Sequence, residues 1–150
     1  MASFEGYHPL LTRRYRFDWL TRFNLKNVAD LTQQELSPTA DWINATMRDT
    51  MDRRKLVWGI EDRATHKLVA WGGFPTLDLG EQTGQVYVLG RPLPTADQQE
   101  ILERLVAFGR DELQLSTLTL QTAKHLDPEA LEAAGFNSKS PQHWEWHRYR

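Results

Sequence analysis

Residues 87–108, YVLGRPLPTADQQEILERLVAF, predict a strand, a loop and then a long helix. Apolar residues recur at helical spacing from Ile101 onward. Thr95 and Gln98 stand three residues apart where the helix begins, which is the spacing of a capping box. Asp97 adds a carboxylate to the same turn. The stretch therefore raises the question of whether this helix start is open to a phosphate or filled by its own side chains.

The rest of the chain alternates between the period of strands and the period of helices. The predicted elements are a strand in 12–21, two helices in 24–50, a hairpin over 55–78, a strand at 83–90, the long helix, a strand at 116–123, a short helix at 126–136 and a strand at 143–150. Thr32, Ser37 and Asp127 are predicted helix caps. This order predicts an α+β fold, an α/β sandwich with a mixed, mainly antiparallel sheet flanked by helices.

Length and composition limit the class of protein. A chain of 150 residues has the size of one domain, so we expect a single domain over residues 1–150. A net charge of -2 provides no basic field for nucleic acid or an anionic membrane. The absence of cysteine excludes disulfides and thiolate zinc sites. With neither a signal-peptide pattern nor a long apolar run, we expect a cytoplasmic protein without a membrane or nucleic-acid partner.

Four segments together resemble the GNAT superfamily of N-acetyltransferases, closest to the branch that acetylates ribosomal-protein N-termini and related amines. They are LTRRYRFDWL at 11–20, LVWGIEDRATHKLVAWGGF at 56–74, VYVLGRPL at 86–93 and LEAAGF at 131–136. The resemblance covers nearly the whole chain. It implies a GNAT-like fold, acetyl-CoA as co-substrate, and a primary amine as acceptor, either a small molecule or a peptide N-terminus.

The resemblance also implies where acetyl-CoA would bind. In such enzymes the fourth strand splays from its neighbour and its backbone pairs with the pantetheine arm, which corresponds to Tyr87, Val88 and Leu89. The pyrophosphate then lies on a glycine-rich loop and the following helix start, where unpaired amides and the helix dipole favour an anion. The implied cofactor-binding residues are Val88, Leu89, Thr95, Ala96, Asp97, Gln98 and Lys124.

The loop departs from the family pattern at a glycine position, which falls on Pro94. Proline has no N–H to donate to a phosphate and cannot adopt a positive φ. A capping box between Thr95 and Gln98 would occupy further donors. Asp97 would repel a phosphate by about 3 kcal/mol at roughly 5 Å and an effective dielectric of about 20. These features predict a helix start that the chain fills itself.

Acetyl transfer needs a group that takes a proton from the amine and a donor for the leaving thiolate. The family's usual base and acid correspond to Gly84 and Leu131, which can do neither. Glu81 is the best substitute base, and Tyr87 is the candidate proton donor. The competing interpretations are a solvated turn glutamate and a core aromatic.

His143 and His147 flank Glu145 on the last predicted strand. Without a third ligand set in sequence they are predicted to be surface residues, and no metal site is expected. Trp58 and Trp71 are predicted to be core residues. Trp42 is left open, because its helix would flank the acceptor cleft if it follows the family.

The sequence and the resemblance lead to two hypotheses for the function. The first is an acyl-CoA-dependent N-acetyltransferase. The alternative is a degenerate GNAT-like domain without cofactor binding that acts as a binding or regulatory module, including through a homodimer. The loop departures at Pro94 and Asp97 favour the alternative, whereas the tolerance of this superfamily for lost side-chain catalysts favours the enzyme.

Overall fold

The computed structural model describes residues 9–121 and 126–148. Its elements in chain order are β1 (Leu10–Leu11), β2 (Tyr15–Trp19), a 3₁₀ helix (Leu20–Arg22), α1 (Leu25–Thr32), α2 (Leu36–Met51), β3 (Leu56–Asp62), β4 (Leu68–Phe74), β5 (Leu77–Asp78), β6 (Thr83–Gln85), β7 (Tyr87–Gly90), α3 (Thr95–Asp111), β8 (Thr117–Gln121), α4 (Pro128–Ala133), β9 (Asn137–Ser140) and β10 (His143–His147). The predicted order is confirmed, and the short strands β1, β5 and β9 are additions to it. No helix in the described ranges has both the length and the apolar character needed to cross a membrane.

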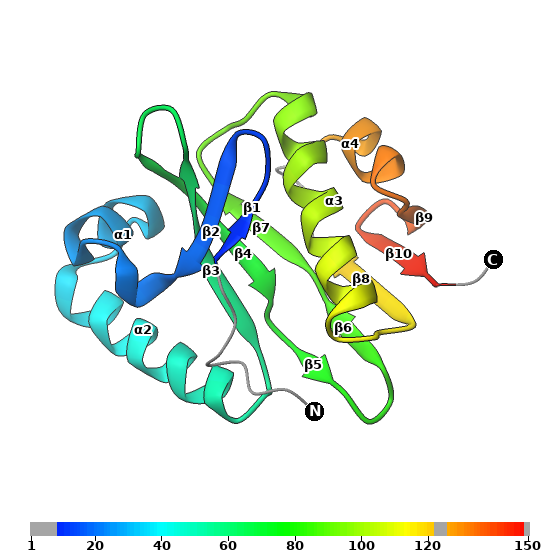
Figure 1. The fold of residues 1–150 in the computed structure, drawn as a ribbon, viewed down its shortest axis with the longest axis horizontal. Helices are drawn as coiled ribbons and strands as arrows, with labels where there is room; N and C mark the ends of the chain where they lie inside the picture. The colour runs from blue at the N-terminus through cyan, green and yellow to red at the C-terminus, as the bar shows by residue number, and fades with distance from the viewer. Residues whose placement is uncertain (1–8, 122–125, 149–150) are drawn as a thin grey trace.

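The strands form two five-stranded sheets, in the orders β1-β2-β3-β4-β7 and β5-β6-β8-β10-β9. Strands β6 and β7 follow each other in the chain but belong to different sheets, with Val86 between them. Strand β7 is antiparallel to β4, whereas β6 is parallel to β8. The predicted single strand at 83–90 is therefore wrong: it changes sheet at Val86. The predicted mixed, mainly antiparallel arrangement is confirmed (Figure 1).

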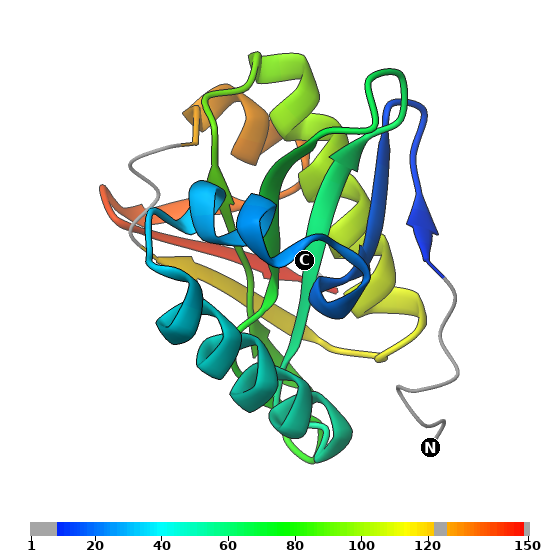
Figure 2. The same ribbon diagram turned by 90° about the vertical axis from the view of Figure 1, so that its left-hand side faces the viewer.

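The helices cover opposite faces of the strands. Figure 2 shows α1 and α2 in front of the first sheet and α3 behind it. The buried residues of α3 and α4 pack in one apolar cluster with both sheets, and Val28 and Ile43 of α1 and α2 pack in another. Along β3 the buried pattern is continuous, because both faces of this strand are covered.

Trp58 is the centre of the larger cluster and is 1% exposed. Its ring stacks on Trp19 at a centroid distance of 5.8 Å and lies edge-on to Phe108 of α3 at 5.2 Å. Phe17 and Phe74 complete the set at 6.3 and 6.1 Å. The predicted core role of Trp58 is confirmed, and this contact joins the first sheet to α3.

The helix boundaries differ from the predicted caps in two places. Thr32 ends α1, and its hydroxyl donates to the Val28 carbonyl, while Asn24 caps that helix. Helix α2 begins at Leu36, so Ser37 lies inside its first turn. A threonine hydroxyl can accept from a free backbone N–H at a helix start or donate to a carbonyl in the last turn of a helix. The sequence pattern around Thr32 does not distinguish these two cases.

Replacing Trp58 with alanine should lower the free energy of unfolding by about 3 to 5 kcal/mol, because it leaves a large cavity among four aromatic rings. Urea unfolding followed by far-UV circular dichroism measures the change. The control is Leu36→Ala, at a side chain 52% exposed, which should stay within about 0.5 kcal/mol of the wild type. Equal effects of both variants would contradict the central position of Trp58.

Candidate functional site

The two sheets separate at Val86. Its amide donates to the Thr119 carbonyl at 2.7 Å, and beyond this bond β7 pairs, within the described ranges, with β4 alone. In an antiparallel ladder, alternate residues direct both backbone groups to the same side. Since the Val86 amide points away from β4, the N–H and C=O of Val88 do so too. The Arg91 amide, three residues after Val88, donates to the carbonyl of Val69 near the start of β4. An odd number of residues separates Arg91 from Val88, so the two amides point to opposite sides, as the alternation requires.

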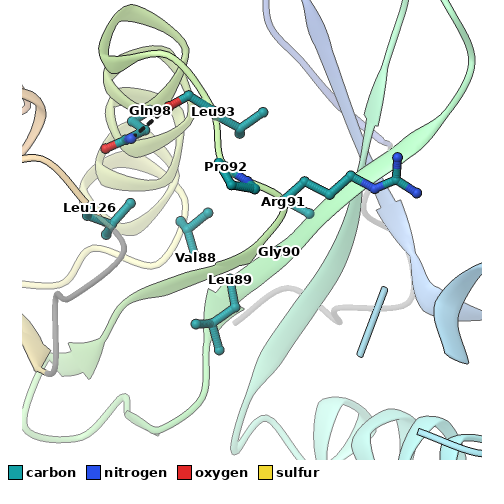
Figure 3. Close-up of a pocket in the computed structure, with 9 residues that line it drawn as sticks. Val88, Leu89, Gly90, Arg91, Pro92, Leu93, Gln98 and Leu126 are labelled. Atoms are coloured by element: carbon teal, nitrogen blue, oxygen red, sulfur yellow. Dashed lines mark hydrogen bonds between the residues drawn. The ribbon is translucent and has the colours of Figure 1, made fainter. Parts of the chain in front are cut away.

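Of the three backbone positions implied by the resemblance, only Val88 therefore faces the open side. Tyr87 and Leu89 direct their backbone groups to β4. A cavity of about 180 Å³ lies beside the open edge. Figure 3 shows Val88, Leu126 and Gln98 bordering the cavity, with the guanidinium of Arg91 directed away from it. The cavity is lined by Ala70, Val88, Leu89, Gly90, Arg91, Pro92, Leu93, Gln98 and Leu126.

The predicted capping box at the start of α3 is wrong. The Thr95 hydroxyl donates to the Asp127 carboxylate, and the Gln98 side-chain oxygen accepts the Asp127 amide at 2.7 Å. The Gln98 side-chain amide donates to the Leu93 carbonyl at 2.9 Å. These bonds tie the start of α3 to the start of α4. Within the described residues the backbone amides of Thr95 and Ala96 have no hydrogen-bond partner.

The predicted repulsion between Asp97 and a phosphate is also wrong. The Asp97 side chain turns toward β2, where the Tyr15 hydroxyl donates to it at 2.6 Å and Arg14 pairs with it at 3.0 Å. Burial, and then the hydrogen bond to Asp97, raise the pKa of Tyr15, which stays a donor. The carboxylate beside the helix start is that of Asp127.

Asp97→Asn should lower the free energy of unfolding by about 1 to 3 kcal/mol, because a buried hydrogen-bonded charge is lost while Tyr15 and Arg14 remain. Urea unfolding of Asp97→Asn, Tyr15→Phe and the double variant measures the coupling. The double variant should be less unstable than the sum of the single ones. Unchanged stability together with tighter acetyl-CoA binding would instead mean that Asp97 faces the ligand.

The proposed catalytic residues lie apart from each other. Glu81 is exposed in the turn between β5 and β6, where its amide donates to the Asp78 carboxylate at 3.0 Å. The five steps of extended chain from Thr83 to Val88 span on the order of 15 Å, which argues against Glu81 as the base. Tyr87 is half-buried on the face opposite α3, and burial raises its pKa. Lys124 lies outside the described residues.

Strand β10 carries a compact polar cluster. The Nε2 atoms of His143 and His147 lie 2.7 and 2.8 Å from the two oxygens of Glu145. These two hydrogen bonds hold the pKa of Glu145 below its usual value, so it is a carboxylate at neutral pH. In the described part of the chain no three His, Asp or Glu side chains are arranged to hold a metal ion.

Sequence reasoning missed the role of Asp127, which it assigned to capping α4. Its position before Pro128 at the N-cap of α4 is confirmed, and Gly135 follows the helix with φ 102°. The Asp127 side chain makes no cap to its own helix within the described residues and bonds to Thr95 instead. A local pattern offers no signal for this contact, because the two residues come from different helices.

The fold has clear counterparts among solved structures. A ribosomal-protein-serine acetyltransferase-like protein from Vibrio cholerae matches with a TM-score of 0.77 at 15% identity, over 93% of this chain and 97% of that one. A GNAT-family acetyltransferase from Bacillus anthracis matches with a TM-score of 0.69 at 12% identity, over 95% of this chain and 100% of that one. The fold is that of the GNAT acetyltransferases.

Spermidine N-acetyltransferase from Vibrio cholerae, in a dodecameric structure, has the same fold. Its TM-score is 0.72 at 11% identity, over 91% of this chain and 95% of that one. No family model matches the sequence, and no curated protein matches it. The likeness is therefore one of fold, and the split between β7 and β8 corresponds to the splayed strand expected from the GNAT resemblance.

Proposed function

We propose that the protein is an N-acetyltransferase that moves an acetyl group from acetyl-CoA to a primary amine. The observation that carries this proposal is the open backbone edge at Val88 beside the cavity. An unpaired N–H and C=O in a strand edge bind an extended amide chain in the way that another strand would. The pantetheine arm is a chain of this kind.

The cavity suits the arm better than it suits the pyrophosphate. Val88, Leu89, Leu93 and Leu126 provide apolar walls for the alkyl parts of the arm. The amides of Thr95 and Ala96, at the positive end of the α3 dipole, are the donors for a phosphate. Pro94 contributes no donor, and the Asp127 carboxylate opposes an anion there. We therefore expect weaker binding than an open glycine loop would give.

The reaction needs little side-chain chemistry from this chain. The amine nitrogen attacks the thioester carbonyl, the N–C bond forms, the C–S bond breaks, and one proton passes from the amine to solvent while the thiolate takes up another. Tyr87 is protonated at neutral pH and so fits the donor role rather than that of a base. Positioning of the two reactants would supply most of the rate.

The amine acceptor is supported by the neighbours, which include enzymes named for ribosomal-protein and spermidine acetylation. The dodecameric neighbour makes self-association of this chain part of the proposal, and sedimentation of the purified protein measures it. A module without cofactor binding is the second candidate, favoured by Pro94 and by the carboxylate of Asp127 at the helix start.

Isothermal titration with acetyl-CoA tests the proposal directly. Val88→Pro should weaken binding at least about tenfold, because proline removes the N–H of the open edge without removing a ladder bond to β4. Val88→Ala keeps that N–H and serves as the matched control for the lost side chain. Equal affinities of the two variants would exclude this edge as the binding element. No heat from the wild type at millimolar ligand would favour the module.

Asp127→Asn should tighten acetyl-CoA binding by about three- to tenfold, because it removes the charge and keeps an acceptor for Thr95. Pantetheine, which lacks the pyrophosphate, should bind both proteins equally in the same titration. Asp111→Asn, at the opposite end of α3, is the control. An equal gain for pantetheine would show that the charge of Asp127 acts on the arm rather than on the phosphates.

A further inference from the structure

Three half-buried aromatic rings lie on the face opposite α3, next to the split. Trp42 of α2 and Trp71 of β4 meet edge-on at a centroid distance of 5.0 Å, and Trp71 meets Tyr87 of β7 at 4.8 Å. We call Trp42, Trp71 and Tyr87 the aromatic cluster. Each ring keeps part of its surface exposed. Trp42, whose role the sequence left open, thus packs against Trp71 with part of its ring exposed.

The second sheet has one apolar and one polar face. On β8 and β10 the residues Leu118, Leu120, Trp144 and Trp146 are buried in the core with α3 and α4. The alternate residues of these strands are hydroxyl, amide, imidazole and carboxylate side chains, half-buried or exposed: Thr117, Thr119, Gln121, His143, Glu145 and His147. We call this surface, together with Gln85, the polar face.

The aromatic cluster and the polar face lie on the same side of the molecule. Val86 and Val88 point into the core shared with α3, so Gln85 and Tyr87 point to the opposite side. The register places Gln85 beside Thr119, and Thr119 beside Glu145. Gln85 and Thr119 therefore lie between Tyr87 and Glu145 on this side of the strands.

This surface carries two carboxylates, Glu145 and Asp78. Glu145 keeps its charge between two imidazoles, and its side chain is 25% exposed. Asp78 faces a neighbouring hollow of about 260 Å³ that is lined mainly by threonines of β6 and β8. Strands β5, β6, β8 and β10 carry no Lys or Arg, and Lys139 lies in the bulge of the edge strand β9. Such a surface attracts a cation and gives an alkyl chain threonine methyl groups to pack on.

We propose that this surface binds the acceptor, and that the acceptor is an amine with a second positive charge. The inference rests on the proposed function. The reacting amine lies at the aromatic cluster, beside the open edge of Val88, and the second ammonium binds the carboxylate of Glu145. Aromatic rings stabilise a cation before it loses its proton, and a charge-assisted hydrogen bond to Glu145 fixes the far end.

The register also sets the length of the acceptor. When the spacing of the second sheet is carried on past Val86, Tyr87 lies two residues and two strand spacings from Glu145, which is on the order of 12 Å. An extended chain advances about 3.5 Å in three bonds, so the two nitrogens would be separated by about ten bonds. A linear monoamine of the same length would reach the aromatic cluster but bring no second charge to Glu145.

The test uses the whole protein and two amines of equal length. One is a straight-chain diamine with about ten bonds between its nitrogens, and the other is the corresponding monoamine. Glu145→Gln keeps hydrogen bonds to both histidines and removes the charge. In acetylation assays with acetyl-CoA, its KM for the diamine should rise about five- to tenfold, and its KM for the monoamine should not change. Glu103→Gln, on the exposed side of α3, is the control.

Titration of the diamine into the protein without acetyl-CoA separates the two proposals. Binding that Glu145→Gln weakens, combined with no acetylation, would support the surface and overturn the proposed function. If the protein acetylates both amines and Glu145→Gln raises both KM values equally, the role of Glu145 is overturned and the proposed function stands. The same conclusion follows if the wild type acetylates both amines without preferring the diamine.

Discussion

Among the described residues, the hydrogen bond from the Val86 amide to the Thr119 carbonyl is the last one that joins this strand to β8, and the candidate site depends on it. Before this bond the strand belongs to the second sheet, and after it to the first. Because backbone groups alternate along a strand, the bond fixes Val88 as the residue with an open edge. The same alternation places Tyr87 on the face opposite α3. One residue thus orients both the proposed cofactor edge and the proposed acceptor surface.

The start of α3 is held independently of that edge. Asp97 fastens its first turn to Tyr15 of β2, and Trp58 packs against Phe108 nearer its end. With the helix fixed at both points, its start lies beside α4, whose Asp127 accepts a hydrogen bond from the Thr95 hydroxyl. The site therefore combines a strand edge that suits an extended amide chain with a helix start that opposes an anion. The pantetheine arm and the pyrophosphate of acetyl-CoA would therefore meet opposite conditions at the two ends of the site.

Much of the fold was predictable because its signals are local. The hairpin over 55–78 is marked by two apolar runs around a polar turn, and the short helix by Pro128 at its start and Gly135 after its end. The change of sheet at Val86 was not predictable. Val86 and Val88 alternate with polar or half-buried neighbours in the same way whether the strand stays in one sheet or leaves it.

The candidate site was predictable as a region but not in its polar contacts. The sequence placed a phosphate-facing carboxylate near Thr95 and identified it as Asp97, yet the structure gives that position to Asp127. Spacing within one helix describes which side chains can reach that helix's own backbone. It does not describe the rotation of α3 against β2, which turned Asp97 inward.

By itself, the sequence determined the order of elements, the apolar side of each strand and the residues available at the helix start, because these follow from local periodicity and backbone chemistry. Only the tertiary structure decided which strand edge is open, which carboxylate faces the helix start, and that Trp42, Trp71, Tyr87 and Glu145 share one surface. The physical reason is that hydrogen-bond partners and packing faces are chosen between segments far apart in the chain, where local patterns carry no information.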